Sequence, residues 1–353
     1  MLIKLNKEYF SSIEYLIPKV GAEKSLLFSR DYLNSLINLK SIKNIIENLK
    51  NTKYGELIEY LKPETTEDLE FIIEEFLISK YNKMIKASPE VINKFLSTMG
   101  LKFEIQNIKK LIKAKILNLS INEINKLVHM SIEHLYNRYD LFNKLIYSGS
   151  LIDLINSIKI DFYSSALKEA LHAYQDTKTI YLFDCLLDLD YFKLLIEEAK
   201  NLKLLDNKFI RNLLKLEADI YNILTVMRSK HFGLKSHQIL RLIVHDPILS
   251  PEIFYDKLIK TESFKEALQL IKKRFKNDPY FDQIDSIEML YLYLNKIKLK
   301  FYIENSIMRF SIEYPISTLK ILEFEAKNLI SIINGVNYGL EPEDIFKNLI
   351  LLD

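Results

Sequence analysis

Apolar residues recur at intervals of three and four along most of the chain, which is the spacing of amphipathic helices. Ile108, Leu111 and Ile112, for example, share one helix face. No strand-like alternation is evident, and only seven Gly and eight Pro interrupt the 353 residues. The sequence therefore predicts an all-α protein. Helices are expected over residues 4–16, 26–38, 41–48, 67–85, 89–99, 179–198, 286–307 and 316–334, with breaks at 62–64, 87–89, 245–251 and 277–279.

One helix–turn–helix pattern occurs three times without gaps, over residues 104–128, 219–243 and 325–349. Each copy opens with an acid, has Asn three residues later, and has Gly or Asn followed by Leu eleven residues after that first Asn. These signature residues are Glu104, Asn107, Asn118 and Leu119, then Asp219, Asn222, Gly233 and Leu234, then Glu325, Asn328, Gly339 and Leu340. Apolar positions agree between any two amphipathic helices, so the polar positions carry the evidence for duplication.

Local physics accounts for most of this spacing. Gly and Asn best tolerate the left-handed conformation that ends a helix, so the first helix should stop at that position in every copy. The second helix then has its own start signals, which are Ser120 with Glu123 as a capping box, Ser236 as a cap, and Pro342 in a first turn. The Leu of the turn is expected to pack between the two helices. Small residues precede the turn by four positions, where close helix approach would require them: Ala114, Ser229 and Gly335.

The repeated Asn is not explained by helix propensity. We expect its side-chain amide to bind backbone groups of the turn or of a neighbouring helix, or else to contact a partner protein. A second block recurs before each signature, with a Ser that is expected to cap a helix at Ser41, Ser150 and Ser263. Because both blocks keep their order and spacing, the chain is interpreted as an N-terminal helix packed on the body (1–24) and three helical repeat units (25–135, 136–247 and 248–353).

Charge and cysteine content exclude several classes of protein. Forty-nine Lys and Arg balance 47 Asp and Glu, giving +2, so no overall field favours nucleic acid or an acidic membrane. Basic runs at 109–115 and 272–276 are interpreted as solvated helix faces. The single Cys185 excludes an internal disulfide and is expected to be buried. No apolar run approaches membrane-spanning length, so any membrane association should be peripheral.

Candidate chemistry is sparse. His129, Glu133 and His134 resemble an inverted zincin motif, but the first spacing is one residue too long for a shared metal. Asp184 and Asp188 share a helix face but lack the adjacent Asp–Asp pair of a magnesium–diphosphate site. We therefore predict no catalytic residue, no metal and no cofactor.

The ending over residues 325–335 and 338–345 strongly resembles the C-terminal signature of the C subunit of archaeal-type and bacterial V-type rotary ATPases, called the d subunit in eukaryotic V-ATPases. Residues 36–41 and 52–55 are similar to the family as well, and so are Asp219 and Asn222 with Met227 and Arg228. The resemblance spans essentially the whole chain. The chain departs from the family at residues 17–21 and at Ile330 and Ser331, where the family carries arginines.

The resemblance implies three similar helical bundles about a pseudo-threefold axis, arranged as a funnel or wheel. It implies a non-catalytic central-stalk subunit, a socket between the rotor shaft and the membrane proteolipid ring that serves proton-driven ATP synthesis or ATP-driven ion pumping. The implied partners are central-stalk subunits and the proteolipid ring, at the cytoplasmic face of the cell membrane, without nucleic acid or a small-molecule substrate. The alternatives left open are a generic α-helical protein-binding scaffold outside a rotary ATPase and, more remotely, an all-helical enzyme.

Overall fold

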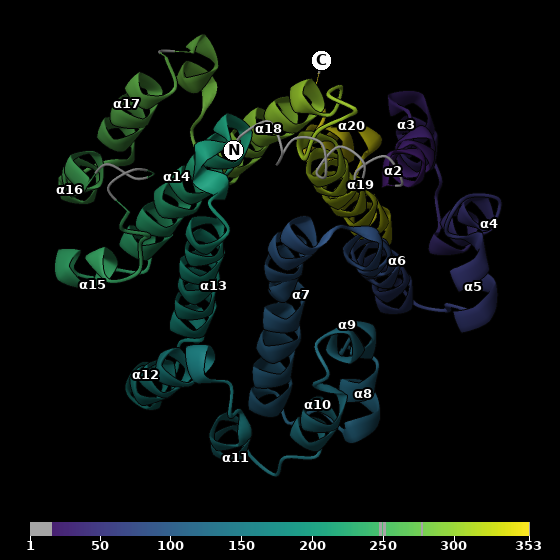
Figure 1. The fold of residues 1–353 in the computed structure, drawn as a ribbon, viewed down its shortest axis with the longest axis horizontal. Coiled ribbons are helices and arrows are strands. Elements are labelled where there is room, and N and C mark those ends of the chain that lie inside the picture. The colour runs from purple at the N-terminus through teal and green to yellow at the C-terminus, as the bar shows by residue number, and fades with distance from the viewer. Residues whose placement is uncertain (1–15, 247–248, 250–251, 277, 353) are drawn as a thin grey trace. The chain divides into compact units, whose positions relative to one another are not determined.

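A computed structural model describes residues 16–246, 249, 252–276 and 278–352. Within these residues the regular structure is helical and no β-strand is present, which confirms the predicted all-α class (Figure 1). The expected helix at 4–16 lies almost entirely outside the described residues. The chain groups into two compact units, one holding the described residues up to 158 and from 299 onward, the other holding 159–298.

The larger compact unit combines the beginning and the end of the chain. Its long helices α6, α7 and α19 form a central group in which α6 packs against both others, and α2 packs on α19 and α6. The helices of this unit are α2 (Leu16–Ser25), α3 (Arg30–Ile37), α4 (Ile42–Lys50), α5 (Gly55–Leu61), α6 (Thr66–Ala87), α7 (Glu90–Ile116), α8 (Ile121–Asn125), α9 (Met130–Leu135), α10 (Tyr139–Ile146), α11 (Leu151–Ser157), α19 (Glu313–Asn337) and α20 (Pro342–Lys347).

The smaller compact unit contains two prominent helix pairings, α12 with α13 and α14 with α16. Helix α18 is the last helix that begins in this unit, and its C-terminal part belongs to the larger unit. The elements here are α12 (Asp161–Thr177), α13 (Tyr181–Asn201), η1 (Leu204–Asp206), α14 (Lys208–His231), α15 (Ser236–Leu240), α16 (Glu252–Lys260), α17 (Phe264–Arg274), η2 (Pro279–Gln283) and α18 (Ile287–Asn305).

Several helix starts follow directly from the predicted caps. The hydroxyls of Ser41, Ser150 and Ser263 accept hydrogen bonds from backbone N–H groups of the first turns of α4, α11 and α17. This confirms all three predicted Ser caps. In contrast, the helix expected to begin at residue 26 begins only at Arg30, because Ser29 caps α3 and the chain turns between α2 and α3.

One predicted helix end is absent. The helix expected to end at Met99 continues through Gly100 to Ile116. A Cβ atom at position 100 would lie 2.6 Å from the Tyr136 hydroxyl, which donates a hydrogen bond of 2.6 Å to the Ser97 carbonyl. Gly100 therefore serves a close side-chain approach inside a continuous helix, and it does not end the helix.

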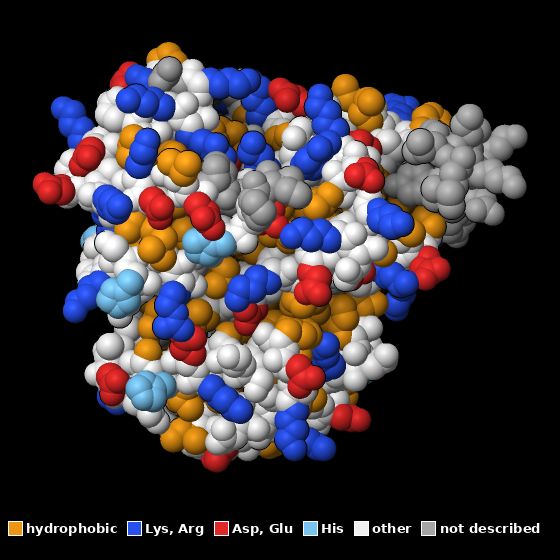
Figure 2. All heavy atoms as spheres, turned by 60° about the vertical axis from the view of Figure 1, so that its left-hand side comes forward, with side chains coloured by type: hydrophobic (Ala, Val, Ile, Leu, Met, Phe, Trp, Pro, Cys, Tyr) orange, Lys and Arg blue, Asp and Glu red, His pale blue; other side chains and the backbone are white. Residues whose placement is uncertain are grey.

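Charged side chains of both signs are intermingled on the face shown in Figure 2, in agreement with the balanced composition.

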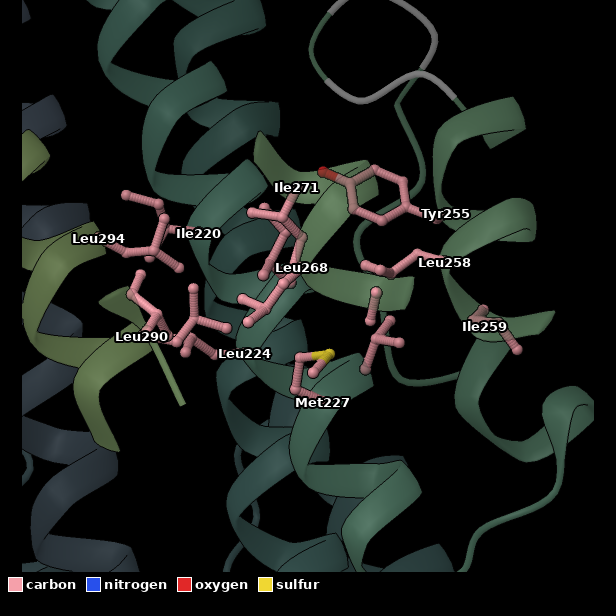
Figure 3. Packing of buried hydrophobic residues seen from close by; sticks show 14 of the residues in the cluster. Ile220, Leu224, Met227, Tyr255, Leu258, Ile259, Leu268, Ile271, Leu290 and Leu294 are labelled. Carbon is pink, nitrogen blue, oxygen red and sulfur yellow. The ribbon is translucent and has the colours of Figure 1, made fainter. Parts of the chain in front are cut away.

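In the core of the smaller unit, the apolar face of α14 packs against α16, α17 and α18 (Figure 3). Ile223, Val226 and Met227, the face predicted for the second signature, are all buried there. Each fully buried side chain of this kind contributes about 1.5–3 kcal/mol to folding, so this packing fixes the helix that carries the second signature.

Candidate functional site

The three signatures lie at the C-terminal ends of long helices and on the short helix that follows each one. The long helices are α7, α14 and α19, and the short helices are α8, α15 and α20. Asn118, Gly233 and Gly339 have φ angles of 54°, 73° and 67°, in the left-handed region. The predicted left-handed helix ends are therefore confirmed at all three positions.

Each turn closes with the same backbone hydrogen bonds. The N–H of the Leu after the left-handed residue donates to a carbonyl five residues back, from Leu119 to Ala114 (3.0 Å), from Leu234 to Ser229 (2.9 Å) and from Leu340 to Gly335 (2.9 Å). This 6→1 bond defines the Schellman motif, which satisfies carbonyls that the helix end would otherwise leave free. The side chains of these Leu residues differ, however. Leu340 is 47% exposed, so the expectation that it packs between two helices is wrong there.

The second helices start as predicted in two copies. Ser120 and Glu123 form the expected capping box of α8, and Pro342 occupies the first turn of α20. The predicted cap Ser236 is instead the first residue of α15. Gln238 reaches back to accept a hydrogen bond from the Lys235 N–H at 2.8 Å, so the helix begins one residue earlier than expected.

The repeated Asn residues make identical contacts. Asn107, Asn222 and Asn328 are at most 4% exposed. Each side chain binds the backbone of one residue 22 positions further along the chain. Its Oδ1 accepts a hydrogen bond from the N–H of that residue, and its Nδ2 donates one to the carbonyl of the same residue. The two distances are 2.9 and 2.9 Å for Asn107 with His129, 2.7 and 3.0 Å for Asn222 with Val244, and 2.8 and 3.0 Å for Asn328 with Ile350.

We call this arrangement the asparagine clamp. The clamped residue lies just beyond the short second helix, so the clamp ties the chain leaving that helix back onto the long first helix. An amide side chain suits this task because it offers one acceptor and one donor in a plane, matching the N–H and C=O of a single residue. A buried backbone segment outside regular structure needs such partners. The side-chain amide of each Asn thus binds backbone groups, as one of the predicted alternatives states. The backbone that it binds lies after the second helix of each signature.

The acid three residues before each Asn is also buried and carries a charged partner. Glu104 binds the guanidinium of Arg138, Asp219 binds Arg274 at 2.7 Å, and Glu325 binds Lys53 at 2.5 Å. All three carboxylate side chains are at most 8% exposed. A buried carboxylate needs such a partner, because burial without compensation costs several kcal/mol per ion.

Tyrosine hydroxyls complete two of these sites. Tyr255 donates to Asp219 at 2.6 Å, and Tyr54 donates to Glu325 at 3.2 Å. Glu325 also accepts a hydrogen bond of 2.6 Å from the Phe28 N–H. Burial is the main cause that raises the pKa of Tyr54 well above its usual value, with the Glu325 charge adding to it, so this phenol stays protonated as a donor.

The partners of the first two acids come from the segment that follows each signature. Arg138 follows the first signature, and Tyr255 and Arg274 follow the second. Glu325 of the third signature instead takes Lys53 and Tyr54, which precede all three signatures in the sequence. The packing of α19 against α2, α3, α4 and α6 brings these residues together. The third signature is thereby joined to the segment between α4 and α5 through buried polar contacts.

The first signature has a second buried acid. Glu133 is fully buried and accepts a hydrogen bond of 2.7 Å from Asn107 Nδ2. Burial, and then the nearby charge of Glu104, raise the pKa of Glu133 to about 9. Glu133 is therefore a neutral carboxylic acid at neutral pH, and Arg138 balances Glu104 alone.

The small residues before each turn permit close contact in at least one copy. A Cβ atom at Gly335 would lie 2.6 Å from Cγ1 and 2.9 Å from Cδ1 of Ile345, the Ile of the third signature. Ile345 is 2% exposed and has little room to move. The predicted requirement for a small residue therefore holds at Gly335.

The chain is similar to known proteins over nearly its whole length. Residues 16–347 match the model of the ATP synthase (C/AC39) subunit family. The chain belongs to this family. It is 26% identical over 357 residues to the C subunit of the A-type ATP synthase of Methanococcoides burtonii, covering 97% of this chain and 95% of that protein. It is also 23% identical over 361 residues to the protein of the same name from Methanocaldococcus jannaschii, covering 96% and 86% of the two chains.

The histidines of the inverted zincin-like pattern, His129 and His134, contact other side chains of the protein. Nδ1 and Nε2 of the buried His129 face Glu75 and Glu74, each at 2.8 Å. Burial would raise the pKa of Glu74, but hydrogen bonds from His129 and the Lys110 charge outweigh burial and lower it to about 2. His134 stacks on Tyr139. In the described part of the chain, no group of three or more His, Cys, Asp or Glu side chains is arranged so that it could hold a metal ion.

Some important residues carry no signal of their role in the sequence. Arg274 and Lys110 belong to the basic runs interpreted above as solvated helix faces, and that interpretation is wrong for both. Arg274 pairs with the buried Asp219, and Lys110 pairs with Glu74 at 2.6 Å. Arg138 stands in no motif, and Lys53 lies in the segment 52–55 that resembles the family without any sign of its partner. Each buried signature acid requires a cation, but the sequence alone does not identify which one.

The predicted burial of Cys185 is confirmed. None of the described helices combines the length and apolar character needed to span a bilayer.

Proposed function

We propose that this chain is a non-catalytic coupling part of a rotary ATPase, a socket between the central rotor shaft and the membrane proteolipid ring. The observation that carries the proposal is the family match over residues 16–347. The curated relatives, which this chain matches over most of their length, are C subunits of A-type ATP synthases. In such a role the chain transmits torque between ion flow and ATP chemistry, and needs no catalytic residue of its own.

The buried polar contacts support a mechanical role. A part that transmits torque must resist bending, and the asparagine clamps tie each long helix to the segment beyond the following helix by paired hydrogen bonds. The buried ion pairs at Glu104, Asp219 and Glu325 add contacts that are costly to separate, because each leaves an uncompensated charge when broken. Close packing of apolar side chains in the cores gives further stiffness.

We further propose that the three repeat units (25–135, 136–247 and 248–353) arose by triplication and surround a pseudo-threefold axis. The identical clamps and the acid pairs support this, and so does the return of the third acid to Lys53 and Tyr54 at the beginning of the chain. In this arrangement the twelve signature residues hold the units together. The stalk subunits and the proteolipid ring bind other surfaces of the chain. The chain would act at the cytoplasmic face of the membrane as a peripheral component of the complex.

A binding experiment tests the coupling role. The purified full chain is immobilised, and a central-stalk subunit and detergent-solubilised proteolipid ring from the same source are added separately and together. The proposal predicts capture of each alone and a ternary complex when both are present. Capture of neither would reject the coupling role and favour a scaffold outside a rotary ATPase.

A further inference from the structure

An apolar groove of about 350 Å³ lies in the larger compact unit, next to the third signature. Its walls include Leu27 and Leu33, Leu299 and Ile303 of α18, and Ile321 and Phe324 of α19. The polar groups that line it include the Lys24 ammonium, the Ser306 hydroxyl and Glu325. Glu325 already binds Lys53, Tyr54 and the Phe28 N–H, so its charge is compensated inside the protein.

The turn between α18 and α19 carries exposed apolar side chains beside this groove. Ile307, which also lines the groove, is 69% exposed. Met308 is 57% exposed and Phe310 is 62% exposed, while Ile303 on the last turns of α18 is 41% exposed. Scattered apolar residues are ordinary on protein surfaces, but three exposed apolar residues within four positions, one of which lines an apolar groove, indicate a contact surface.

Charged side chains of both signs lie at this turn, with Arg309 inside it and Glu304 and Glu313 flanking it. Arg309 stands between Met308 and Phe310, and its charge acts on Lys24, whose Nζ donates to the Ser306 carbonyl at 2.8 Å. Burial is the larger cause that lowers the pKa of Lys24, and the Arg309 charge is the second cause. Among the described residues neither cation forms an ion pair with an acid. Lys327 lies over the ring of Phe324, which is a wall residue, at 5.2 Å from its centroid. Lys24, which lines the groove, and Arg309 are therefore the groups beside this turn that can bind an anion.

We propose that this groove and turn bind an anionic phospholipid of the membrane surface, with an alkyl chain in the groove and the phosphate at Lys24 and Arg309. Exposed Ile, Met and Phe beside basic residues are the composition of segments that insert at the boundary between headgroups and acyl chains. Lys and Arg near such a surface add attraction to acidic lipids. The turn would anchor the chain to lipid beyond its contacts with protein partners, which goes further than the proposed coupling function.

The test is co-sedimentation of the full chain with vesicles of phosphatidylcholine alone and of phosphatidylcholine with about 30% phosphatidylglycerol, an anionic lipid. Two variants are compared with the wild type, the double variant Ile307→Ser with Phe310→Ser and the single variant Arg309→Gln. Both alter exposed side chains, so both should fold. Tyr60→Ser, at an 82% exposed apolar residue elsewhere, is the matched control. We expect the wild type and the control to bind the anionic vesicles and to bind the neutral vesicles weakly. Arg309→Gln should weaken binding about fivefold, as expected for one basic residue at an anionic surface, and the double variant should lower it further.

Three results would overturn this inference. They are absence of wild-type binding to anionic vesicles, equal binding of the double variant and the control, or equal binding to the two kinds of vesicle. If binding of a central-stalk subunit is lost in the double variant while vesicle binding is unchanged, the surface belongs to a protein contact and the lipid assignment is wrong. Pull-down of the stalk subunit by the same variants separates failure of this inference from failure of the coupling function.

Discussion

Asn328 and Ile350 are joined by two hydrogen bonds between one side-chain amide and one backbone residue. Asn328 Nδ2 donates to the Ile350 carbonyl at 3.0 Å, and Oδ1 accepts from the Ile350 N–H at 2.8 Å. Asn107 and Asn222 hold His129 and Val244 in the same way. The clamp explains why Asn, a poor helix former, stands inside three long helices.

Replacing Asn328 by Leu should destabilise the protein by ~1–3 kcal/mol, because the Ile350 N–H and carbonyl lose their partners in a buried place. The measurement is the free energy of unfolding from urea titration. Asn337→Leu, at an exposed position of the same helix, is the control and should change stability by less than ~0.5 kcal/mol. Equal stability of the two variants would show that the clamp contributes nothing.

The buried pair of Glu325 and Lys53 should show strong coupling. Glu325→Gln leaves the Lys53 ammonium buried without a counter-charge and should cost ~3–5 kcal/mol. The double variant Glu325→Gln with Lys53→Met removes both charges and should recover much of that loss. A double-mutant cycle on unfolding free energies measures the coupling.

The exposed pair of Glu47 and Lys50 provides the comparison for that cycle. Glu47→Gln should change stability by only a few tenths of a kcal/mol, because solvent screens an exposed ion pair. Additive losses at Glu325 and Lys53 would contradict the role given to the buried pair.

Gly335→Ala should destabilise the protein although Ala is the better helix former. The gain of ~1 kcal/mol in helix propensity is opposed by overpacking against Ile345, which costs ~1–3 kcal/mol. Gly21→Ala is the matched control, because a Cβ atom there would meet only the Tyr314 hydroxyl at 3.5 Å. Thermal unfolding should give a lower Tm for the first variant and an unchanged or higher Tm for the second. The opposite order would reject the close contact.

Glu133 should make stability fall as the pH rises. Its folded pKa of about 9 lies above the ordinary value of 4.5, so the folded protein retains a proton that the unfolded chain releases. This contribution is fully present below pH ~4.5 and is lost progressively up to about pH 9. Glu133→Gln keeps a neutral side chain and should remove the decline, which is at most ~1.4 kcal/mol per pH unit. Parallel stability–pH curves for variant and wild type would contradict the neutral carboxylic acid.

Local sequence signals are sufficient for most of the helices and their ends. The left-handed residues Asn118, Gly233 and Gly339 and the caps Ser41, Ser150 and Ser263 are all predictable, because each depends on a few neighbouring residues. Gly100 shows the limit of such signals. A Gly at a plausible helix end and a Gly that admits Tyr136 to a continuous helix look alike until the tertiary contact is known.

The contacts that hold the signatures together could not be predicted in the same way. An Asn in an amphipathic helix predicts a backbone partner but not that the partner lies 22 residues away. Glu325 requires a cation, but the chain has 49 Lys and Arg, and Lys53 becomes its partner only when α19 packs on α4 and α6. The triplication and the partner surfaces stay predictions for the same reason, since they depend on arrangements beyond each compact unit.

The most direct test of the coupling function uses an assembled rotary ATPase from which this chain is omitted and then added back. ATP hydrolysis and ATP-driven ion uptake are measured together in reconstituted vesicles. Our account predicts that the complex without the chain still hydrolyses ATP but does not move ions, and that adding the chain restores ion uptake. Undiminished ion uptake without the chain would contradict the account.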